Sequence, residues 1–271
     1  MIFGQKIGNA YNFKIYDMMR YLIKLPIFKR LIPSLYKIYL YLTQNYFHNI
    51  KVKNIIYNLD LRHLIDRRFF FHREYEKELF FPLKNCIDKY KINIFLDIGS
   101  CWGIYSLRLS SVENLKIFSF DPILKNIDRL KKSILDNDIK NIKIFHTAIG
   151  SFKGTIELGA TEDFSPNYKI NEANSVIKEK CSIDTVDNLV FFKNENIAIK
   201  IDTEGHEFNV LSGADKLLRN NNCYCQIEVS SGDHEKIFNY FTERNYKLIS
   251  VNKKNKLDYI FSNFIDEKII L

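Results

Sequence analysis

The strongest chemical signal in the sequence is a group of ionisable residues that follows an apolar run. Residues 197–201 (IAIKI) are apolar apart from one lysine, and Asp202, Glu204, His206 and Glu207 come directly after them. Helix capping would explain one of the acids, but hardly two acids together with a histidine. Such a cluster can orient an acceptor group and take up its proton. We therefore assign Asp202, Glu204 and His206 as candidate catalytic residues.

A second signal is an acid that precedes a glycine turn in residues 95–103 (FLDIGSCWG). Gly99 and Gly103 allow a ligand to approach the backbone, and the N–H groups of the turn would offer donors to a carboxylate or phosphate. The G-x-x-x-G spacing differs from the G-x-G-x-x-G of dinucleotide sites. Asp97 suits a cationic group, such as the amino or sulfonium region of S-adenosylmethionine. The alternative is a tight turn that binds no ligand.

A third signal ends the next apolar run, where Asp121 and Pro122 follow 24 and 25 residues after Asp97. An acid at this place can accept both hydroxyls of a ribose. Its alternative role is to cap the following helix. Because the carboxyl ends of adjacent parallel strands meet at one crevice, the two acids together favour a nucleoside-type ligand.

The elements that must position these residues alternate between strands and helices. Short apolar runs predict strands at 94–98, 116–120, 142–147, 197–201 and 224–229, and amphipathic patterns predict helices at 102–112, 124–138, 207–218 and 233–244. This alternation indicates a doubly wound α/β sheet with helices on both faces. Residues 150–185 break the rhythm and are expected to form small strands and loops. Residues 246–262 predict a hairpin, and hence an antiparallel edge.

The charge of the chain is concentrated at its beginning. Residues 1–53 hold nine Lys/Arg and one Asp, a net charge of +8, whereas residues 54–271 hold 31 bases and 31 acids. We therefore divide the chain into a basic, tyrosine-rich helical extension at 1–53, with turns at Pro26 and Pro33, and a main domain at 54–271.

The extension suggests a partner. The tyrosines and bases of residues 11–48 are typical of an interfacial amphipathic surface, so we expect docking to an anionic membrane or to a membrane-bound glycosyltransferase. The alternative is a helical cap on the sheet that mediates a dimer. The first thirty residues lack a secretory pattern, and the five cysteines lack paired metal-ligand spacing. These features predict a cytoplasmic protein, with peripheral association at the inner membrane face as the finer expectation.

Several segments together resemble the FkbM family of S-adenosylmethionine-dependent methyltransferases. They are FLDIGSCWGIYSL, FSFDP, HTAIGSFKG, SIDTVDNL, IKIDTEGHEFNVLSGA and IEVS, in the family's order, and HREYEKEL is similar to the Tyr-Glu segment that precedes the first glycine motif. The resemblance covers residues 54–262. It implies the class I methyltransferase fold, a Rossmann-like, mostly parallel seven-stranded sheet, and S-adenosylmethionine as cofactor.

The resemblance also implies site residues. Cofactor contacts are expected from Asp97, Gly99, Ser100, Gly103, Asp121, Pro122, Ala148 and Ile149, the last two near the adenine, and weaker candidates are Tyr75, Glu76 and Glu228. Where the family has Gly-Ala-Asn this chain has Gly99-Ser100-Cys101, so Ser100 would replace an amide contact. Asp121 stands for the family's Glu. Glu228 alternatively ends its strand in a salt bridge, and His206 would be specific to this protein's substrate.

The favoured function is O-methylation of a sugar or surface-glycan hydroxyl in polysaccharide biosynthesis, with a carbohydrate or glycolipid acceptor. A nucleic-acid methyltransferase is one alternative, but the neutral main domain and the absence of a Pro-Pro turn count against nucleic acid. A catalytically silent nucleoside-binding scaffold is another. Asp202 and Glu204 alone are an incomplete site for a divalent metal, so we assign no metal ligand and do not favour metal dependence.

Overall fold

The computed structural model describes residue 18 and residues 21–160, 168–170, 175–229, 232–252 and 257–268. The chain forms two compact units, Met1–Tyr75 and Glu76–Leu271, and residue 53, where the sequence changes in charge, lies inside the first of them. A hairpin spans this position, because β1 (Phe47–Val52) pairs antiparallel with β2 (Ile55–Asp60).

The first unit places helices beside this hairpin. Within its described residues it contains the helices α2 (Phe28–Thr43) and α3 (Leu64–His72). Aromatic rings hold the elements together, since Tyr36 of α2 stacks on Phe70 of α3 with centroids 5.5 Å apart, and Tyr57 of β2 meets Phe69 edge-on at 4.8 Å. Within the described part of the chain, no helix is long and apolar enough to cross a bilayer.

The structure corrects one expectation for this unit. Pro26 lies in the turn before α2, as predicted, but Pro33 lies inside α2 and does not end it. A proline removes one backbone hydrogen bond from a helix. Burial of the helix face formed by Ile32, Tyr36 and Leu40 stabilises the helix on both sides of that position.

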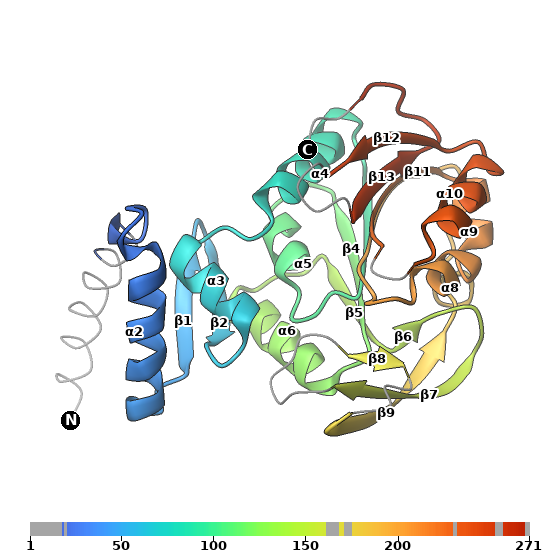
Figure 1. Ribbon diagram of the computed structural model, residues 1–271. Helices are drawn as coiled ribbons and strands as arrows, with labels where there is room; N and C mark the ends of the chain where they lie inside the picture. The colour runs from blue at the N-terminus through green and yellow to red at the C-terminus, as the bar shows by residue number, and fades with distance from the viewer. Residues whose placement is uncertain are drawn as a thin grey trace. The chain divides into compact units, whose positions relative to one another are not determined.

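The second unit contains the predicted seven-stranded sheet, in the order β12-β13-β11-β10-β3-β4-β5 (Figure 1). The five strands from β11 to β5 are parallel, and the hairpin β12–β13 adds two antiparallel strands at one edge. The strands are β3 (Ile94–Ile98), β4 (Lys116–Asp121), β5 (Ile142–His146), β10 (Asn196–Ile201), β11 (Asn222–Glu228), β12 (Lys247–Val251) and β13 (Asp258–Ser262). The α/β class and the edge hairpin are confirmed.

Helices cover both faces of this sheet, which explains why its strands are almost continuously apolar. Figure 1 shows α4, α5 and α6 on one side and α8, α9 and α10 on the other. Their bounds are α4 (Lys77–Lys89), α5 (Ile104–Leu109), α6 (Leu124–Asp136), α7 (Val186–Leu189), α8 (Glu207–Ser212), α9 (Asp215–Asn220) and α10 (His234–Thr242). The predicted helix at 207–218 is thus two short helices, because Gly213 and Ala214 separate α8 from α9.

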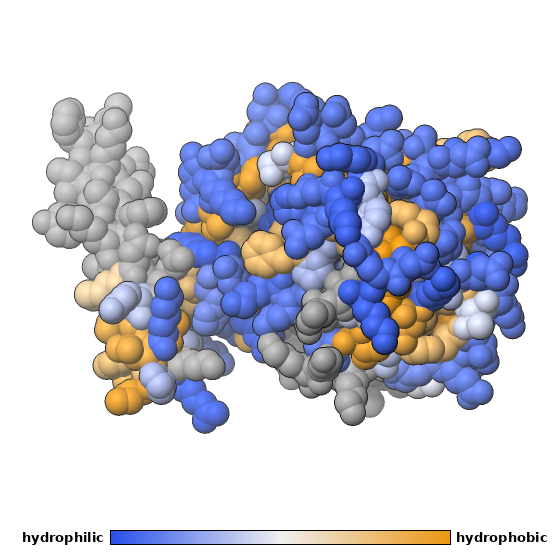
Figure 2. Space-filling view, turned by 90° about the horizontal axis from the view of Figure 1, so that it is seen from above, coloured by the Kyte–Doolittle hydropathy of each residue, from blue (hydrophilic) through white to orange (hydrophobic). Residues whose placement is uncertain are grey.

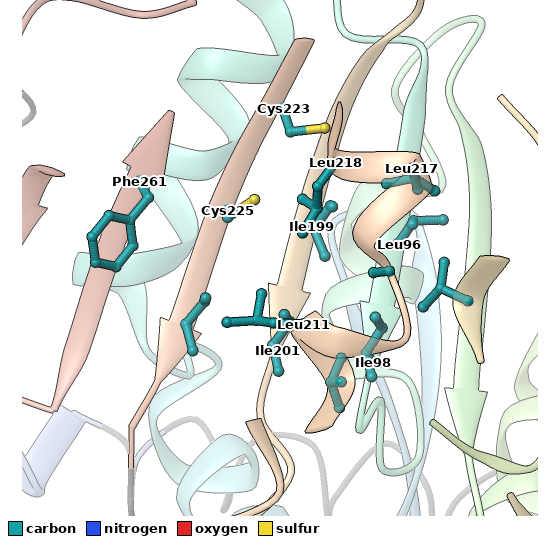
Figure 3. Close-up of a cluster of buried hydrophobic side chains, with 14 of the residues drawn as sticks. Leu96, Ile98, Ile199, Ile201, Leu211, Leu217, Leu218, Cys223, Cys225 and Phe261 are labelled. Carbon is teal, nitrogen blue, oxygen red and sulfur yellow. The ribbon is translucent and has the colours of Figure 1, made fainter. Parts of the chain in front are cut away.

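The main hydrophobic core lies between the sheet and helices α8 to α10. Figure 3 shows Leu96 and Ile98 of β3 and Ile199 and Ile201 of β10 together with leucines of α8 and α9. Leu96 and Ile98 are spaced two apart in β3, as Ile199 and Ile201 are in β10, so these four side chains face the same side of the sheet. The residues between them therefore face α4, α5 and α6.

The expected excursion at 150–185 is a second, four-stranded sheet in the order β6-β9-β7-β8. Its strands are β6 (Ala148–Ile149), β7 (Gly154–Ala160), β8 (Lys169–Ile170) and β9 (Ile177–Asp184). Ala148 and Ile149 are buried in the cores next to this sheet. The sheet therefore covers the segment that follows β5.

Candidate functional site at the carboxyl ends of the strands

A row of polar side chains crosses the buried sheet on the face opposite the main core. Asp97 of β3 is in register with Lys200 of β10, and Lys200 is in register with Gln226 of β11. All three residues are buried. Polar groups are costly to bury unless they are paired, so this row is a feature that hydrophobic packing alone does not explain.

Lys200 is the centre of this row. Its Nζ donates to Oδ2 of Asp202 at 2.7 Å and lies 4.9 Å from the centroid of the Tyr105 ring, whose hydroxyl donates to Oε2 of Glu76 at 2.9 Å. Burial opposes the charge of Lys200, but Asp202, Glu76 and Asp97 together raise its pKa well above the usual range. The lysine is therefore a buried cation.

Asp97 links β3 to α5 as well as facing Lys200. Its Oδ2 accepts from the hydroxyl of Ser106 at 2.6 Å and from the Ser106 N–H at 3.2 Å, and the Ser106 hydroxyl lies 2.6 Å from that of Ser119. Burial raises the pKa of Asp97, while Lys200 and these hydrogen bonds lower it. Asp97 thus anchors the helix that follows the glycine turn.

The N–H groups of the glycine turn are bonded within the protein. Gly99 and Ser100 both donate to the carbonyl of Phe120 at 3.0 Å, and Cys101 donates to Oδ2 of Asp121 at 2.8 Å. The expectation that these particular N–H groups offer donors to a carboxylate or phosphate is therefore wrong. The cause is the close approach of β3 and β4, whose ends tie the turn to the sheet.

The turn is nevertheless shaped by its glycine and leaves one polar atom available. Gly99 has a φ of +77°, and a Cβ there would lie 1.8 Å from the carbonyl oxygen of Asp202, so no other residue fits. Ser100 Oγ is buried and makes no hydrogen bond to the described residues. A buried hydroxyl without a partner is costly, so a ligand atom could satisfy it.

Asp121 caps the segment that leads into α6. Its Oδ1 accepts from the Ile123 N–H and from Nδ2 of Asn126, both at 3.0 Å, in addition to the Cys101 contact at Oδ2. The carboxyl is 5% exposed, and burial raises its pKa to about 7. These bonds fit the alternative capping role, and binding of a ribose remains a prediction. The carbonyl of Pro122 lies 2.9 Å from Nε2 of His146.

The acids after β10 have different environments. Asp202 forms an ion pair with Lys200. Glu204 is half-buried, and its φ of +52° is a strained backbone conformation for a residue other than glycine. Burial and the Asp202 charge raise the pKa of Glu204. Glu207 is fully buried and accepts from the Gly205 N–H at 2.7 Å. Glu207 therefore stabilises the turn.

His206 faces the second sheet. Its Nδ1 lies 3.1 Å from Nδ2 of Asn209, and its buried Nε2 makes no hydrogen bond to any residue that the structure describes. A Cβ on Gly150, which follows β6, would lie 2.9 Å from this Nε2. Burial lowers the pKa of His206, so the ring is neutral at pH 7. Because the Asn209 amide donates to Nδ1, the ring proton is on Nε2.

Glu228 and Glu76 complete the acidic surroundings of Lys200. Glu228 ends β11 in register with Asp258 of β13, and burial together with Asp202 and Asp258 raises its pKa to about 8. Glu76 has a φ of +45° and precedes α4, and its side chain binds Tyr105 without capping that helix. Tyr75, the last residue of the first unit, stays a prediction.

The arrangement can hold a cation. Five carboxyl groups, those of Glu76, Asp97, Asp202, Glu228 and Asp258, interact with one another or with Lys200, which is a single positive charge. Among the described residues, no three His, Cys, Asp or Glu side chains are placed to bind a metal. The excess of acid favours a ligand with a positive charge next to the strand ends.

Sequence reasoning missed three members of this site: Lys200, Tyr105 and Gln226. The signal was present for two of them, because a lysine and a glutamine interrupt otherwise apolar strands at positions that share one face. Tyr105 gave no signal, since an aromatic residue on α5 is ordinary core composition.

Comparisons with known proteins agree with these motifs. The sequence model of the methyltransferase FkbM domain matches residues 97–248. A search of curated protein sequences finds no significant match.

Three solved structures illustrate the structural comparison. Methyltransferase FkbM from Methylobacillus flagellatus KT is 14% identical with a TM-score of 0.48, over 72% of this chain and 52% of that one. A SAM-dependent methyltransferase from Aquifex aeolicus is 12% identical with a TM-score of 0.42, over 68% of this chain and 90% of that one. M. jannaschii TYW2, solved with AdoMet, is 10% identical with a TM-score of 0.42, over 80% and 84%. The chain spans about half the length of the first of these.

Proposed function

Because the chain belongs to the family of methyltransferase FkbM domains, we propose that it uses S-adenosylmethionine to methylate a hydroxyl group of a carbohydrate or glycolipid. The cofactor would lie at the carboxyl ends of β3, β4, β10 and β11. Binding there agrees with the general position of ligands in open α/β sheets.

The observation that carries the proposal is the acid excess around Lys200. S-adenosylmethionine is positively charged at its sulfonium and amino groups, and when bound it supplies an electrophilic methyl group. Asp97 and Asp202 lie at the ends of the neighbouring strands β3 and β10 and would stabilise this positive charge, and a bound cation would favour ionisation of Glu228 at the end of β11. The unpaired Ser100 hydroxyl and the close packing at Gly99 also fit a ligand that lies against the turn.

A hydroxyl acceptor is favoured because its methylation requires a base, and this site contains a candidate for one. A sugar hydroxyl is a weak acid, and it must lose its proton as the new carbon–oxygen bond forms and the carbon–sulfur bond breaks. Glu204 is half-buried and its pKa is raised, so its carboxylate is a better base than an ordinary one. We assign proton uptake to Glu204, orientation of the acceptor to Asp202, and hydrogen-bond donation to His206 through Nε2.

The first experiment measures binding and turnover separately. Calorimetry should detect S-adenosylmethionine binding, and production of S-adenosylhomocysteine should depend on a carbohydrate-containing acceptor pool. Glu204→Gln is expected to lower turnover about 10²- to 10⁴-fold with unchanged cofactor affinity. Glu157→Gln, on the exposed surface of β7, is the matched control.

The outcomes are distinct. Failure to bind S-adenosylmethionine would remove the cofactor assignment, whereas binding followed by transfer only to RNA would replace the acceptor class. Transfer is expected to persist in a chelator, and its loss would show that a divalent metal takes part.

A further inference from the structure

The first unit carries an apolar surface that does not belong to its core. Four residues of α2 are spaced four, three and four apart and share one face of the helix. These residues, here called the α2 stripe, are Leu31, Leu35, Ile38 and Leu42, with exposed fractions of 47%, 55%, 56% and 74%. Figure 2 shows hydrophobic residues gathered over α2 at the left of the view. Large exposed apolar patches usually mark an interaction surface.

The orientation of the stripe is fixed by the other face of α2. Tyr36 stacks on Phe70 and meets Phe71 edge-on at 5.4 Å, and Leu40 is 1% exposed. Turning the stripe inward would remove these contacts. The stripe therefore remains on the outside of the first unit.

The charges next to the stripe identify its partner. Lys24, Arg30 and Lys37 are exposed, and Arg30 and Lys37 are seven residues apart on one face of the helix region. Residues 18–59 contain no Asp or Glu. A second copy of this surface would bring like charges together, which disfavours self-association, whereas an anionic lipid surface supplies the opposite charge.

We propose that the α2 stripe and its neighbouring bases dock the protein on an anionic lipid bilayer. The leucines and isoleucine would enter the boundary between headgroups and acyl chains while the bases contact the lipid phosphates. The long side chains of Arg30 and Lys37 can extend from the helix to the headgroups. This docking is independent of the methyl-transfer proposal, because its residues lie in the first unit.

The test is sedimentation of the full-length protein with vesicles. We expect binding to vesicles of mixed phosphatidylcholine and phosphatidylglycerol that weakens as salt is added, and little binding to phosphatidylcholine alone. Replacing both bases, Arg30→Gln with Lys37→Gln, should lower the binding constant about 30-fold, since each base near an anionic surface contributes about fivefold. Leu35→Glu should lower it about tenfold or more.

The matched control is Leu135→Glu on α6, where the leucine is 80% exposed. This variant should bind like the wild type, and circular dichroism should show the same helix content in every variant. Equal binding to neutral vesicles, no binding to either kind, or equal losses in Leu35→Glu and Leu135→Glu would overturn the proposal. So would a dimer in ultracentrifugation that Leu35→Glu dissociates, because the stripe would then be an interface between copies.

Discussion

At the scale of single residues, the buried charge of Lys200 decides the properties of the site. Its partners Asp202, Glu76 and Asp97 are carboxyl groups, and together they hold the lysine charged in spite of its burial. In return, the charge of Lys200 lowers the pKa of Asp97, which burial raises. Lys200 lies within the motif IKIDTEGHEFNVLSGA, but its role becomes visible only from its contacts in the folded sheet.

Lys200→Met should therefore destabilise the protein strongly. Removing one member of a buried ion pair leaves the other uncompensated and costs roughly 3–5 kcal/mol of unfolding free energy. Urea unfolding followed by fluorescence of Trp102, the only tryptophan and a buried one, measures this loss. Lys193→Met changes an exposed lysine and should leave the unfolding curve in place. Equal curves for both variants would show that the Lys200 network contributes nothing to stability.

His206 offers a second prediction at this scale. With Asn209 donating to Nδ1, the ring is neutral and carries its proton at Nε2. Asn209→Asp would place a carboxylate beside Nδ1, which favours protonation there and should raise the pKa of His206. Titration of the imidazole nitrogen signals by NMR, in the wild type and in the variant, measures the change. An unchanged His206 pKa would contradict the assigned hydrogen bond.

At the scale of elements, close backbone contacts fix how the second sheet meets the main one. A Cβ on Gly213, after α8, would lie 1.9 Å from the carbonyl oxygen of Gly150, after β6. The φ of Gly213 is −84°, an ordinary value, so the requirement for glycine is one of space. This contact also holds His206 against Gly150.

Gly213→Ala should consequently lower the free energy of unfolding by roughly 1–3 kcal/mol, the usual range for overpacking. The added methyl group must push two backbone segments apart, because neither is a flexible side chain. Gly232→Ala is the control, since a Cβ there meets nothing within 4 Å. Thermal unfolding of the two variants gives the comparison, and a Gly213→Ala protein as stable as the control would refute the close contact.

The elements also show what a sequence can predict. The strands of the seven-stranded sheet were predictable because burial on both faces leaves nearly continuous apolar runs, as in 94–98 and 197–201. The helix through Pro33 was not, because packing of Tyr36 and Leu40 outweighs the local effect of proline. The pairing of β1 with β2 across residue 53 was not predictable, because it depends on contacts that charge composition does not report.

For the candidate site, the sequence predicts where the polar residues lie but not which partners their side chains have. Motifs identified the strand ends, since acids after apolar runs are local features. Whether an acid is available to a ligand depends on neighbours distant in sequence. The Cys101 N–H donates to the Asp121 carboxyl, and the Ser106 hydroxyl donates to the Asp97 carboxyl. The spacing of these residues in the sequence predicts neither hydrogen bond.

At the scale of the whole molecule, positive and negative charges are concentrated in different parts of the chain. The first 53 residues hold the net positive charge, while the second unit buries a group of acids around one lysine. The two regions therefore respond to different conditions. Added salt should weaken attraction of the basic segment to anionic surfaces, because exposed charges are screened, and it should affect the buried acids much less.

The buried acids Asp121 and Glu228 make the stability of the protein depend on pH between about pH 4 and about pH 8. Burial raises the pKa of Asp121 to about 7 and that of Glu228 to about 8, whereas unfolded carboxyl groups titrate near pH ~4. Between those values the folded state holds protons that the unfolded state has released. The contribution of these two carboxyl groups to the unfolding free energy therefore falls as pH rises, and it levels off above about pH 8. His48 and His206, whose pKa values are lowered, act in the opposite direction only near and below about pH 6.5.

We expect the unfolding free energy of the wild type to fall by about 1 kcal/mol between about pH 7 and about pH 8, a value reduced by solvent screening of the partly exposed Glu228. Urea titrations followed by Trp102 fluorescence at several pH values measure the fall. Glu228→Gln cannot ionise and should remove most of it. Glu157→Gln, an exposed acid whose pKa is lowered, should keep it. A wild type whose stability is constant or rises over this range would mean that Glu228 is ionised in the folded protein, and that the strand ends carry one more negative charge at pH 7 than we infer.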